Sequence, residues 1–208
     1  MSDGNGSQWV RRWLSPRDPF LSRIEAEAGG SKVGVTSPEV GRFLGVLARA
    51  TRTGSILEIG TGGGYATACL ARSATSARVV SIDRDAEAGR RASQVLESAG
   101  KLEQVEFLVG DALDILPRLE SRFGLAYVDA EITDYRRLLD LMLPMLEVGG
   151  VVVFDRLLGN IVDERVAEAF TGYVSIHPQL ESLLVPFADG LAVGSKTRPL
   201  ITELGGPF

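Results

Sequence analysis

The chain has 208 residues, of which 45% are hydrophobic and 24% are charged, and its formal net charge is -5. This length suits a single domain with a core beneath a multi-strand sheet. A duplex-binding domain usually carries a basic face against the phosphates, whereas arginine pairs such as Arg90-Arg91 stand isolated in this acidic chain. The composition therefore argues against a nucleic-acid partner.

Cysteine content and apolar runs restrict the environment in which the chain works. Cys69 is the only cysteine, which excludes an intrachain disulfide and a cysteine zinc cluster. Residues 1–8 are polar and glycine-rich, without the apolar stretch of a signal peptide. The longest apolar runs, such as residues 151–154, are too short to cross a bilayer. We expect a cytoplasmic protein without a membrane partner, with a disordered tail over 1–8 and one domain over 9–208.

The predicted elements alternate between strands and helices after two N-terminal helices. Helical patterns cover residues 9–28, with a break before Pro19, and a further helix opens after the capping Ser37 with Pro38 in its first turn. Short apolar strands are predicted over 55–59, 78–82, 105–109, 125–128 and 151–154, and closing strands over 183–185 and 190–193. Helices are predicted over 65–72, 86–98, 112–119, 135–146 (closed by Gly149-Gly150) and 163–170. This alternation predicts a parallel α/β sheet core over 51–208, covered by helices on both faces, with N-terminal helices over 9–50.

A glycine-rich loop, Gly60-Thr61-Gly62-Gly63-Gly64, connects the first predicted strand to its helix. Glycines let the backbone approach a ligand closely, and the N–H groups at the start of the helix can face it. A dinucleotide fingerprint needs glycine at position 65, where this chain has Tyr65. The pattern that fits is E-x-G-x-G-x-G, beginning at Glu58. It favours a ligand loop, and a turn needed only for packing is the alternative.

Acidic residues follow four of the predicted strands. They are Asp83, Asp111, Asp129 and Asp155. The carboxyl ends of parallel strands meet at one edge of the sheet, where open α/β sheets bind their ligands. Asp83 lies nineteen residues after Gly64, where a carboxylate that accepts both ribose hydroxyls is expected, although a cap of the helix at 86 would also explain it. Asp111 could lie beside an adenine or cap the next helix, and the sequence leaves both roles open.

Six segments follow one another in the order found in the bacterial O-methyltransferases, which are related to catechol and caffeoyl-CoA O-methyltransferases. They are TSPEVG (36–41), LEIGTGGGYAT (57–67), GDA (110–112), VDA (128–130), GGVVVFD (149–155) and DGL (189–191). The chain resembles this family from about residue 18 to residue 196. The resemblance implies a single Rossmann-like class I methyltransferase domain with a seven-stranded, mostly parallel sheet, an antiparallel last strand and, often, a homodimer.

The same resemblance implies S-adenosylmethionine as the methyl donor and an in-line displacement that depends mainly on positioning. The donor would be surrounded by Val35, Glu58, Gly60, Thr61, Gly62, Tyr65, Asp83, Arg84, Gly110, Asp111, Ala112 and Asp129.

The acceptor site of the family departs from its usual pattern in this chain. Metal-dependent members carry Asp-Ala-Asp-Lys after the fourth strand and Asp-Asn after the fifth, where two aspartates and the asparagine bind a divalent cation and the lysine helps to deprotonate the hydroxyl. This chain has Asp129-Ala130-Glu131-Ile132 and Asp155-Arg156. Arg156 has donors and no acceptor, so it cannot ligate a metal. We expect a bidentate ion pair between Arg156 and Asp155 instead.

We therefore predict catalytic side chains Asp129, Asp155 and Arg156 on the acceptor side, without an essential metal. Any Mg²⁺ would bind Asp129 and Asp155, with Glu131 and Asn160 as substitutes. His177, the only histidine, is not the expected base. The predicted function is methyl transfer from S-adenosylmethionine to a hydroxyl of a small molecule, with aromatic acceptors among the candidates.

Three other functions were weighed against this prediction. One is a regulatory or interaction protein that binds S-adenosylmethionine and has lost catalysis. Another is a nicotinamide oxidoreductase, against which Tyr65 argues. The last is a DNA or RNA amino-methyltransferase, whose Asn/Asp-Pro-Pro-aromatic run is absent after the fourth strand.

Overall fold

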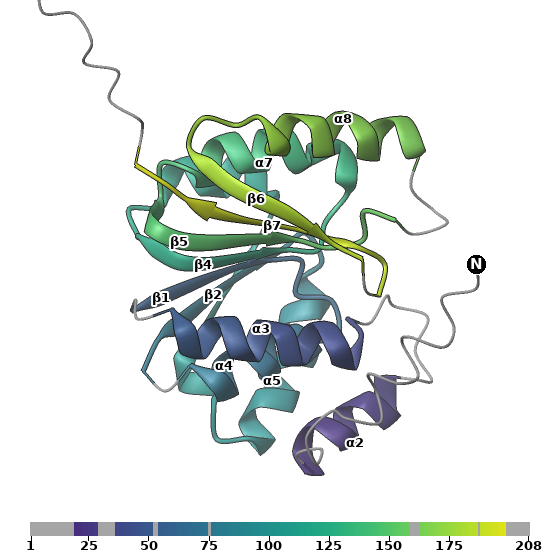
Figure 1. The fold of residues 1–208 in the computed structure, drawn as a ribbon. Helices are drawn as coiled ribbons and strands as arrows, with labels where there is room; N and C mark the ends of the chain where they lie inside the picture. Colours follow the sequence, from purple (N-terminus) through teal and green to yellow (C-terminus); the bar gives the residue numbers. More distant parts are fainter. Residues whose placement is uncertain are drawn as a thin grey trace, which may run out of the picture.

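The computed structural model describes residues 19–28, 36–51, 54–74, 76–158, 163–186 and 188–198. These residues form a seven-stranded sheet in the order β3-β2-β1-β4-β5-β7-β6 (Figure 1). The strands are β1 (Ser55–Ile59), β2 (Arg78–Asp83), β3 (Val105–Val109), β4 (Phe123–Val128), β5 (Leu146–Phe154), β6 (Leu180–Val185) and β7 (Leu191–Lys196). Strands β1 to β5 pair in parallel, and β7 runs antiparallel between β5 and β6. The predicted mostly parallel sheet with an antiparallel last strand is confirmed.

Helices cover both faces of this sheet, as expected. They are α2 (Pro19–Ala28), α3 (Pro38–Ala50), α4 (Tyr65–Ser73), α5 (Ala86–Ser98), α6 (Ala112–Ile115), α7 (Tyr135–Met142) and α8 (Glu164–Ser175), with 3₁₀ turns η1 (Leu102–Gln104), η2 (Leu116–Arg118) and η3 (Ile132–Asp134). One buried cluster joins the sheet to α6, α7 and α8, and a second joins it to α2, α3, α4 and α5. In Figure 1 the α7–α8 layer lies above the sheet and the α3–α5 layer lies below it.

The apolar central strands follow from this two-sided covering. Every residue of β4 is buried, because its alternate side chains face the two helical layers. Complete burial of one aliphatic side chain, such as Leu57 or Leu125, contributes about 1.5–3 kcal/mol. Within the described helices, none is both long and apolar enough to cross a membrane.

The predicted helix starts are confirmed at Pro19 and at Pro38, where the Ser37 hydroxyl accepts a hydrogen bond from the Val40 N–H. The predicted tail over 1–8 and the helical pattern over 9–18 lie outside the described residues.

Three predicted helix ends are wrong. Helix α6 ends at Ile115 and is followed by the 3₁₀ turn η2, whereas the predicted helix ended at residue 119. Helix α7 ends at Met142, and Gly149-Gly150 lies inside β5 rather than closing a helix. The β4–β5 register shifts between Phe123 and Leu125, and Gly149 has a φ of +83°, so the glycines allow an irregular strand. Helix α8 extends to Ser175, beyond the predicted end at residue 170.

Candidate active site

A cavity of about 240 Å³ lies at the carboxyl ends of β1, β2, β3 and β4. Part of its wall consists of residues expected from the sequence to surround the donor. These are Gly60, Asp83, Arg84, Gly110, Asp111, Ala112 and Asp129. The remaining lining residues are Ile59, Ile82, Leu113, Ala130, Glu131, Asp134 and Leu138.

The glycine loop lies against the backbone that follows β4. Gly60 has a φ of +97°, and a Cβ atom there would lie 2.1 Å from the carbonyl oxygen of Asp129. At Gly64, where φ is +80°, a Cβ atom would lie 2.7 Å from the Cα of Ala92 in α5. Glycine is therefore required at both positions for packing. The packing role expected for this loop is confirmed, and its role in binding a ligand stays a prediction.

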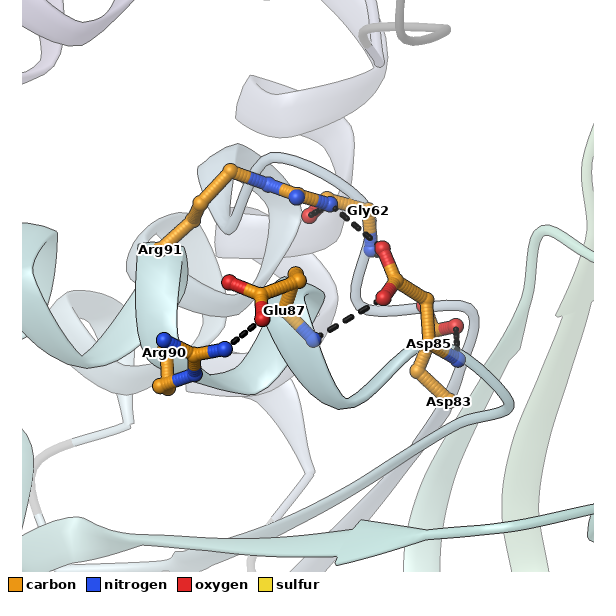
Figure 2. Close-up of polar contacts among 6 residues, drawn as sticks. All are labelled: Gly62, Asp83, Asp85, Glu87, Arg90 and Arg91. Atoms are coloured by element: carbon orange, nitrogen blue, oxygen red, sulfur yellow. Dashed lines mark hydrogen bonds and ion pairs between the residues drawn. The ribbon is translucent and has the colours of Figure 1, made fainter.

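Asp83, at the end of β2, lies on the cavity wall. Its Oδ2 accepts a hydrogen bond from the Gly62 N–H at 3.0 Å, and its Oδ1 accepts one from the Asp85 N–H at 2.9 Å. The cap of α5 is Asp85, whose side chain accepts the Glu87 N–H (Figure 2). The alternative role of Asp83 as the cap of this helix is therefore wrong.

Arg91, on α5, connects the glycine loop to the residues that follow β2. Its Nη2 lies 3.0 Å from the Asp85 carboxylate and donates to the Gly62 carbonyl at 3.4 Å (Figure 2). The loop conformation that brings Gly62 to Asp83 is thus held by α5 as well as by β2.

Arg84, on the cavity wall, forms ion pairs with carboxylates from two other segments of the wall. Its Nη2 lies 2.9 Å from Asp111 Oδ2, after β3, and 3.1 Å from Asp134 Oδ2, just before α7. The Asp111 side chain also caps α6 by accepting the Leu113 N–H at 2.9 Å, so Asp111 is both a cap and a wall residue. Sequence reasoning missed Asp134, which has no motif around it and reaches the cavity through the turn η3.

Four of the expected donor residues do not line this cavity: Glu58, Thr61, Gly62 and Tyr65. Glu58 is fully buried, and its Oε2 accepts hydrogen bonds from Thr67 Oγ1 at 2.6 Å and Ser81 Oγ at 2.5 Å. Thr61 shares a hydrogen bond of 2.6 Å with the Ser81 hydroxyl. Burial raises the pKa of Glu58 to about 8, although the two hydrogen bonds oppose the rise. Tyr65 is 3% exposed, in the buried cluster of the α2–α5 face.

A contact with α3 explains why Tyr65 stands in place of glycine. A Cβ atom on Gly41 of α3 would lie 2.7 Å from the Tyr65 ring. The ring therefore occupies the space that Gly41 leaves. Val35, the remaining expected donor residue, lies outside the described residues, as does Asn160.

Asp155, after β5, is held by a buried network. Its Oδ2 accepts a hydrogen bond from the Tyr127 hydroxyl and its Oδ1 accepts one from the Arg156 N–H, both at 2.7 Å. The Tyr135 hydroxyl donates to the Asp155 carbonyl, also at 2.7 Å. Asp155 is 3% exposed, and burial raises the pKa of its carboxyl group. Both carboxylate oxygens are thus engaged within the protein.

The expected bidentate ion pair between Arg156 and Asp155 is wrong. The guanidinium reaches Asp129 instead, with Nη2 lying 2.7 Å from Oδ2. The reason lies in the backbone, since Arg156 has a φ of +59° and its N–H, rather than its side chain, faces the Asp155 carboxylate. Burial raises the pKa of Asp129 to about 6, although Arg156 opposes the rise.

These contacts do not fit the divalent cation of the metal-dependent relatives. A cation on Asp129 would meet the fixed charge of Arg156, and Asp155 has no carboxylate oxygen without a donor. Among the described residues, no cluster of three or more His, Cys, Asp or Glu side chains could hold a metal ion. His177 does not line the cavity, and its Nδ1 accepts the Gln179 N–H.

Comparison with known proteins identifies the family. A family model described as O-methyltransferase matches residues 21–196. The chain belongs to the O-methyltransferase family. The prediction of an S-adenosylmethionine-dependent O-methyltransferase, made from the resemblance, is thereby confirmed at the level of the family.

Similar proteins and solved structures agree with this assignment. The methyltransferase is 32% identical to a catechol O-methyltransferase of Niastella koreensis, over 69% of this chain and 67% of the relative. It is 33% identical to a catechol O-methyltransferase of Mycobacterium tuberculosis, over 71% and 70%. The structure of the O-methyltransferase TomG from Streptomyces achromogenes in complex with SAM superposes with a TM-score of 0.79, at 27% identity over 93% of this chain and 96% of TomG. Cofactor-bound Rv0187 from MTB gives a TM-score of 0.83 at 27% identity, over 94% and 98%.

Proposed function

We propose that this enzyme transfers the methyl group of S-adenosylmethionine to a hydroxyl group of a small molecule without the help of a metal ion. The observation that carries the metal-free part is the 2.7 Å contact between Arg156 Nη2 and Asp129 Oδ2. It places a permanent positive charge on the carboxylate that would otherwise bind the cation.

The cavity suits the donor in its lining side chains and in their charge. Asp83 lies where a carboxylate can accept the ribose hydroxyls, and Ala112 and Leu113 offer an apolar surface nearby for the adenine. Acidic side chains outnumber the one arginine on the cavity wall, which favours a ligand with a positively charged sulfonium. Relatives of the same fold have structures in complex with SAM and SAH, which supports the same ligand here.

The mechanism follows from positioning. When bound, S-adenosylmethionine supplies an electrophilic methyl group on its sulfonium. The glycine loop and Asp83 would hold the nucleoside end, and Asp129, which lines the cavity and pairs with Arg156, would lie beside the acceptor. Alignment of the two reacting atoms can supply several kcal/mol of the rate enhancement, within a general limit of about 7–11 kcal/mol.

Titration calorimetry with S-adenosylhomocysteine tests the donor site without any knowledge of the acceptor. Asp83→Ala should weaken binding by about 1–3 kcal/mol, the cost of leaving buried polar partners unpaired. The matched control is Glu97→Ala, which removes an exposed carboxylate on α5 that does not line the cavity. Equal effects of the two substitutions would contradict the ribose role. Methylation of catechol with radiolabelled donor should then persist in EDTA, and complete loss restored by Mg²⁺ would overturn the metal-free assignment.

The family resemblance and the composition also support proposals about the domain organisation, the oligomeric state and the location of the enzyme. We propose that residues 9–208 fold as one domain, that the enzyme is a homodimer in the cytoplasm, and that nucleic acid is not its substrate. Light scattering on the purified enzyme tests the dimer, and a mass of one chain at micromolar concentration would refute it.

A further inference from the structure

One carboxylate oxygen at the active site has no hydrogen-bond partner among the described residues. The Asp129 side chain is 8% exposed, and its Oδ2 is held by Arg156. Its Oδ1 is buried and accepts no hydrogen bond from any described residue. Buried polar atoms without partners are rare in native proteins, and each calls for an explanation, such as a bound water, an ion or a catalytic role.

The position of Asp129 limits what that group can be. Asp129 lines the cavity assigned to the donor, and its carbonyl contacts the glycine loop at Gly60. The carboxylate is surrounded by Arg156 on one side and by the negative charges of Asp155 and Asp189. A group that approaches Oδ1 must therefore be a hydrogen-bond donor, because a further acceptor or anion would meet three carboxylates.

The structure also explains what keeps Oδ1 in place. Arg156 fixes the carboxylate through Oδ2, and the positive φ of Arg156 is supported by its N–H bond to Asp155. Asp155 is held in turn by two tyrosines, since the Tyr127 hydroxyl donates to its carboxylate and the Tyr135 hydroxyl donates to its backbone carbonyl. The tyrosines, Asp155 and Arg156 thus act as positioning residues for one oxygen atom of Asp129.

We propose that Asp129 Oδ1 accepts the hydrogen bond of the acceptor hydroxyl, and that the acceptor is a phenol in which one hydroxyl is sufficient. This inference rests on the proposed function. A metal site selects acceptors with two adjacent oxygens that chelate the ion, whereas a hydrogen bond to Oδ1 requires a single O–H. A phenol suits a carboxylate partner better than an alkyl alcohol does, because a phenolic hydroxyl, with an ordinary pKa near 10, is far more acidic.

The step balances without any further reactant. The phenol oxygen forms a bond to the methyl carbon while the bond from carbon to sulfur breaks, and the electron pair of that bond remains on sulfur. The positive charge of the sulfonium is thereby neutralised. The phenolic proton passes along its hydrogen bond to Asp129 Oδ1 and then to water.

The test compares two probe acceptors in the presence of EDTA: catechol, which has two adjacent oxygens, and 4-methoxyphenol, whose hydroxyl has no adjacent oxygen. We expect the full-length enzyme to methylate both, with kcat/KM values within about tenfold of each other. Asp129→Asn should lower kcat by a factor of about 100 or more for both probes, the usual contribution of a positioned proton acceptor. Its affinity for S-adenosylhomocysteine should stay within about threefold of the wild type, since Oδ1 is assigned to the acceptor.

Three further variants separate this role from a loss of folding. Asp114→Asn, an exposed carboxylate on α6 that does not line the cavity, is the matched control and should leave kcat unchanged. Arg156→Lys, which keeps the charge but loses the planar guanidinium, should retain more activity than Arg156→Ala. Equal losses in the two Arg156 variants would contradict the positioning role.

Each other outcome is decisive. If Asp129→Asn keeps kcat within threefold of the wild type, or if only catechol is methylated, the inference is wrong while the proposed function stands. If the variant loses more than tenfold in affinity for S-adenosylhomocysteine, Oδ1 belongs to the donor and the inference is again wrong. If the wild type binds S-adenosylhomocysteine but neither binds nor methylates either phenol, the acceptor class is refuted together with this inference.

Discussion

Glu58→Gln should remove a defined part of the pH dependence of folding. Glu58 is fully buried beneath the glycine loop, and its described partners, Thr67 and Ser81, are uncharged hydroxyls. Burial raises its pKa from 4.5 to about 8, so the folded protein holds a proton there that the unfolded chain releases. The stabilising contribution is fully present below pH 4.5 and is lost as the pH rises through about 8.

The size of the effect follows from this pKa difference. One pKa unit corresponds to 1.36 kcal/mol, and between pH 6 and pH 9 the wild type should lose about 3 kcal/mol of stability at this one group. Glutamine keeps a carbonyl oxygen for the two hydroxyls but does not titrate, so the variant should lose none of it.

Urea denaturation of both proteins at pH 6 and pH 9 measures this difference. Other titrating groups contribute equally to both proteins and cancel in the comparison. Glu97→Gln, an exposed position on α5, is the matched control and should follow the wild type. If the difference in free energy of unfolding between the wild type and Glu58→Gln is the same at both pH values, to within about 0.5 kcal/mol, the assignment of a protonated buried Glu58 is refuted.

Three further substitutions test the cavity. Arg84→Ala should weaken S-adenosylhomocysteine binding by a factor of about 3–10 in calorimetry, since two exposed ion pairs on the cavity wall are lost. This loss of affinity should become smaller in high salt. The control Arg90→Ala, on the outer surface of α5, should leave the affinity unchanged. Gly60→Ala should lower the free energy of unfolding by about 2 kcal/mol or more in urea denaturation. The reason is that a φ of +97° is unfavourable for alanine and that its Cβ would collide with the Asp129 carbonyl. A loss of stability below about 1 kcal/mol would contradict the packing argument. Arg156→Asn should create a Mg²⁺ site detectable by calorimetry, because an amide oxygen replaces the repelling charge and asparagine tolerates a positive φ. Mg²⁺ binding of equal strength by the wild type would contradict this prediction.

Local patterns were sufficient for much of the fold. The predicted bounds of β1, α5 and β3 agree with the structure at residues 55–59, 86–98 and 105–109, because each apolar or amphipathic run is bounded by glycine, an acidic cap or a charged residue. The prediction of seven strands, mostly parallel with an antiparallel last strand, came from the family resemblance, which the comparisons confirm. Gly149-Gly150 was misassigned because a glycine pair signals a helix end and an irregular strand equally well, and only the pairing of β5 with β4 distinguishes the two.

The sequence by itself determined which chemical groups reach the carboxyl edge of the sheet. The glycine loop and the acids after four strands follow from spacing along the chain, since parallel strands bring their carboxyl ends together. The arginine at position 156, where the family resemblance implies an asparagine ligand, was likewise recognised before the tertiary structure.

The tertiary structure decided which of these groups face the cavity and which face the core. Glu58 and Tyr65 turn inward because hydroxyl partners and the space above Gly41 are available to them there. Arg156 pairs with Asp129 rather than with its neighbour Asp155 because the backbone turns at a positive φ. Such choices depend on contacts between residues far apart in the chain, and side-chain direction at a strand end carries no periodic signal in the sequence.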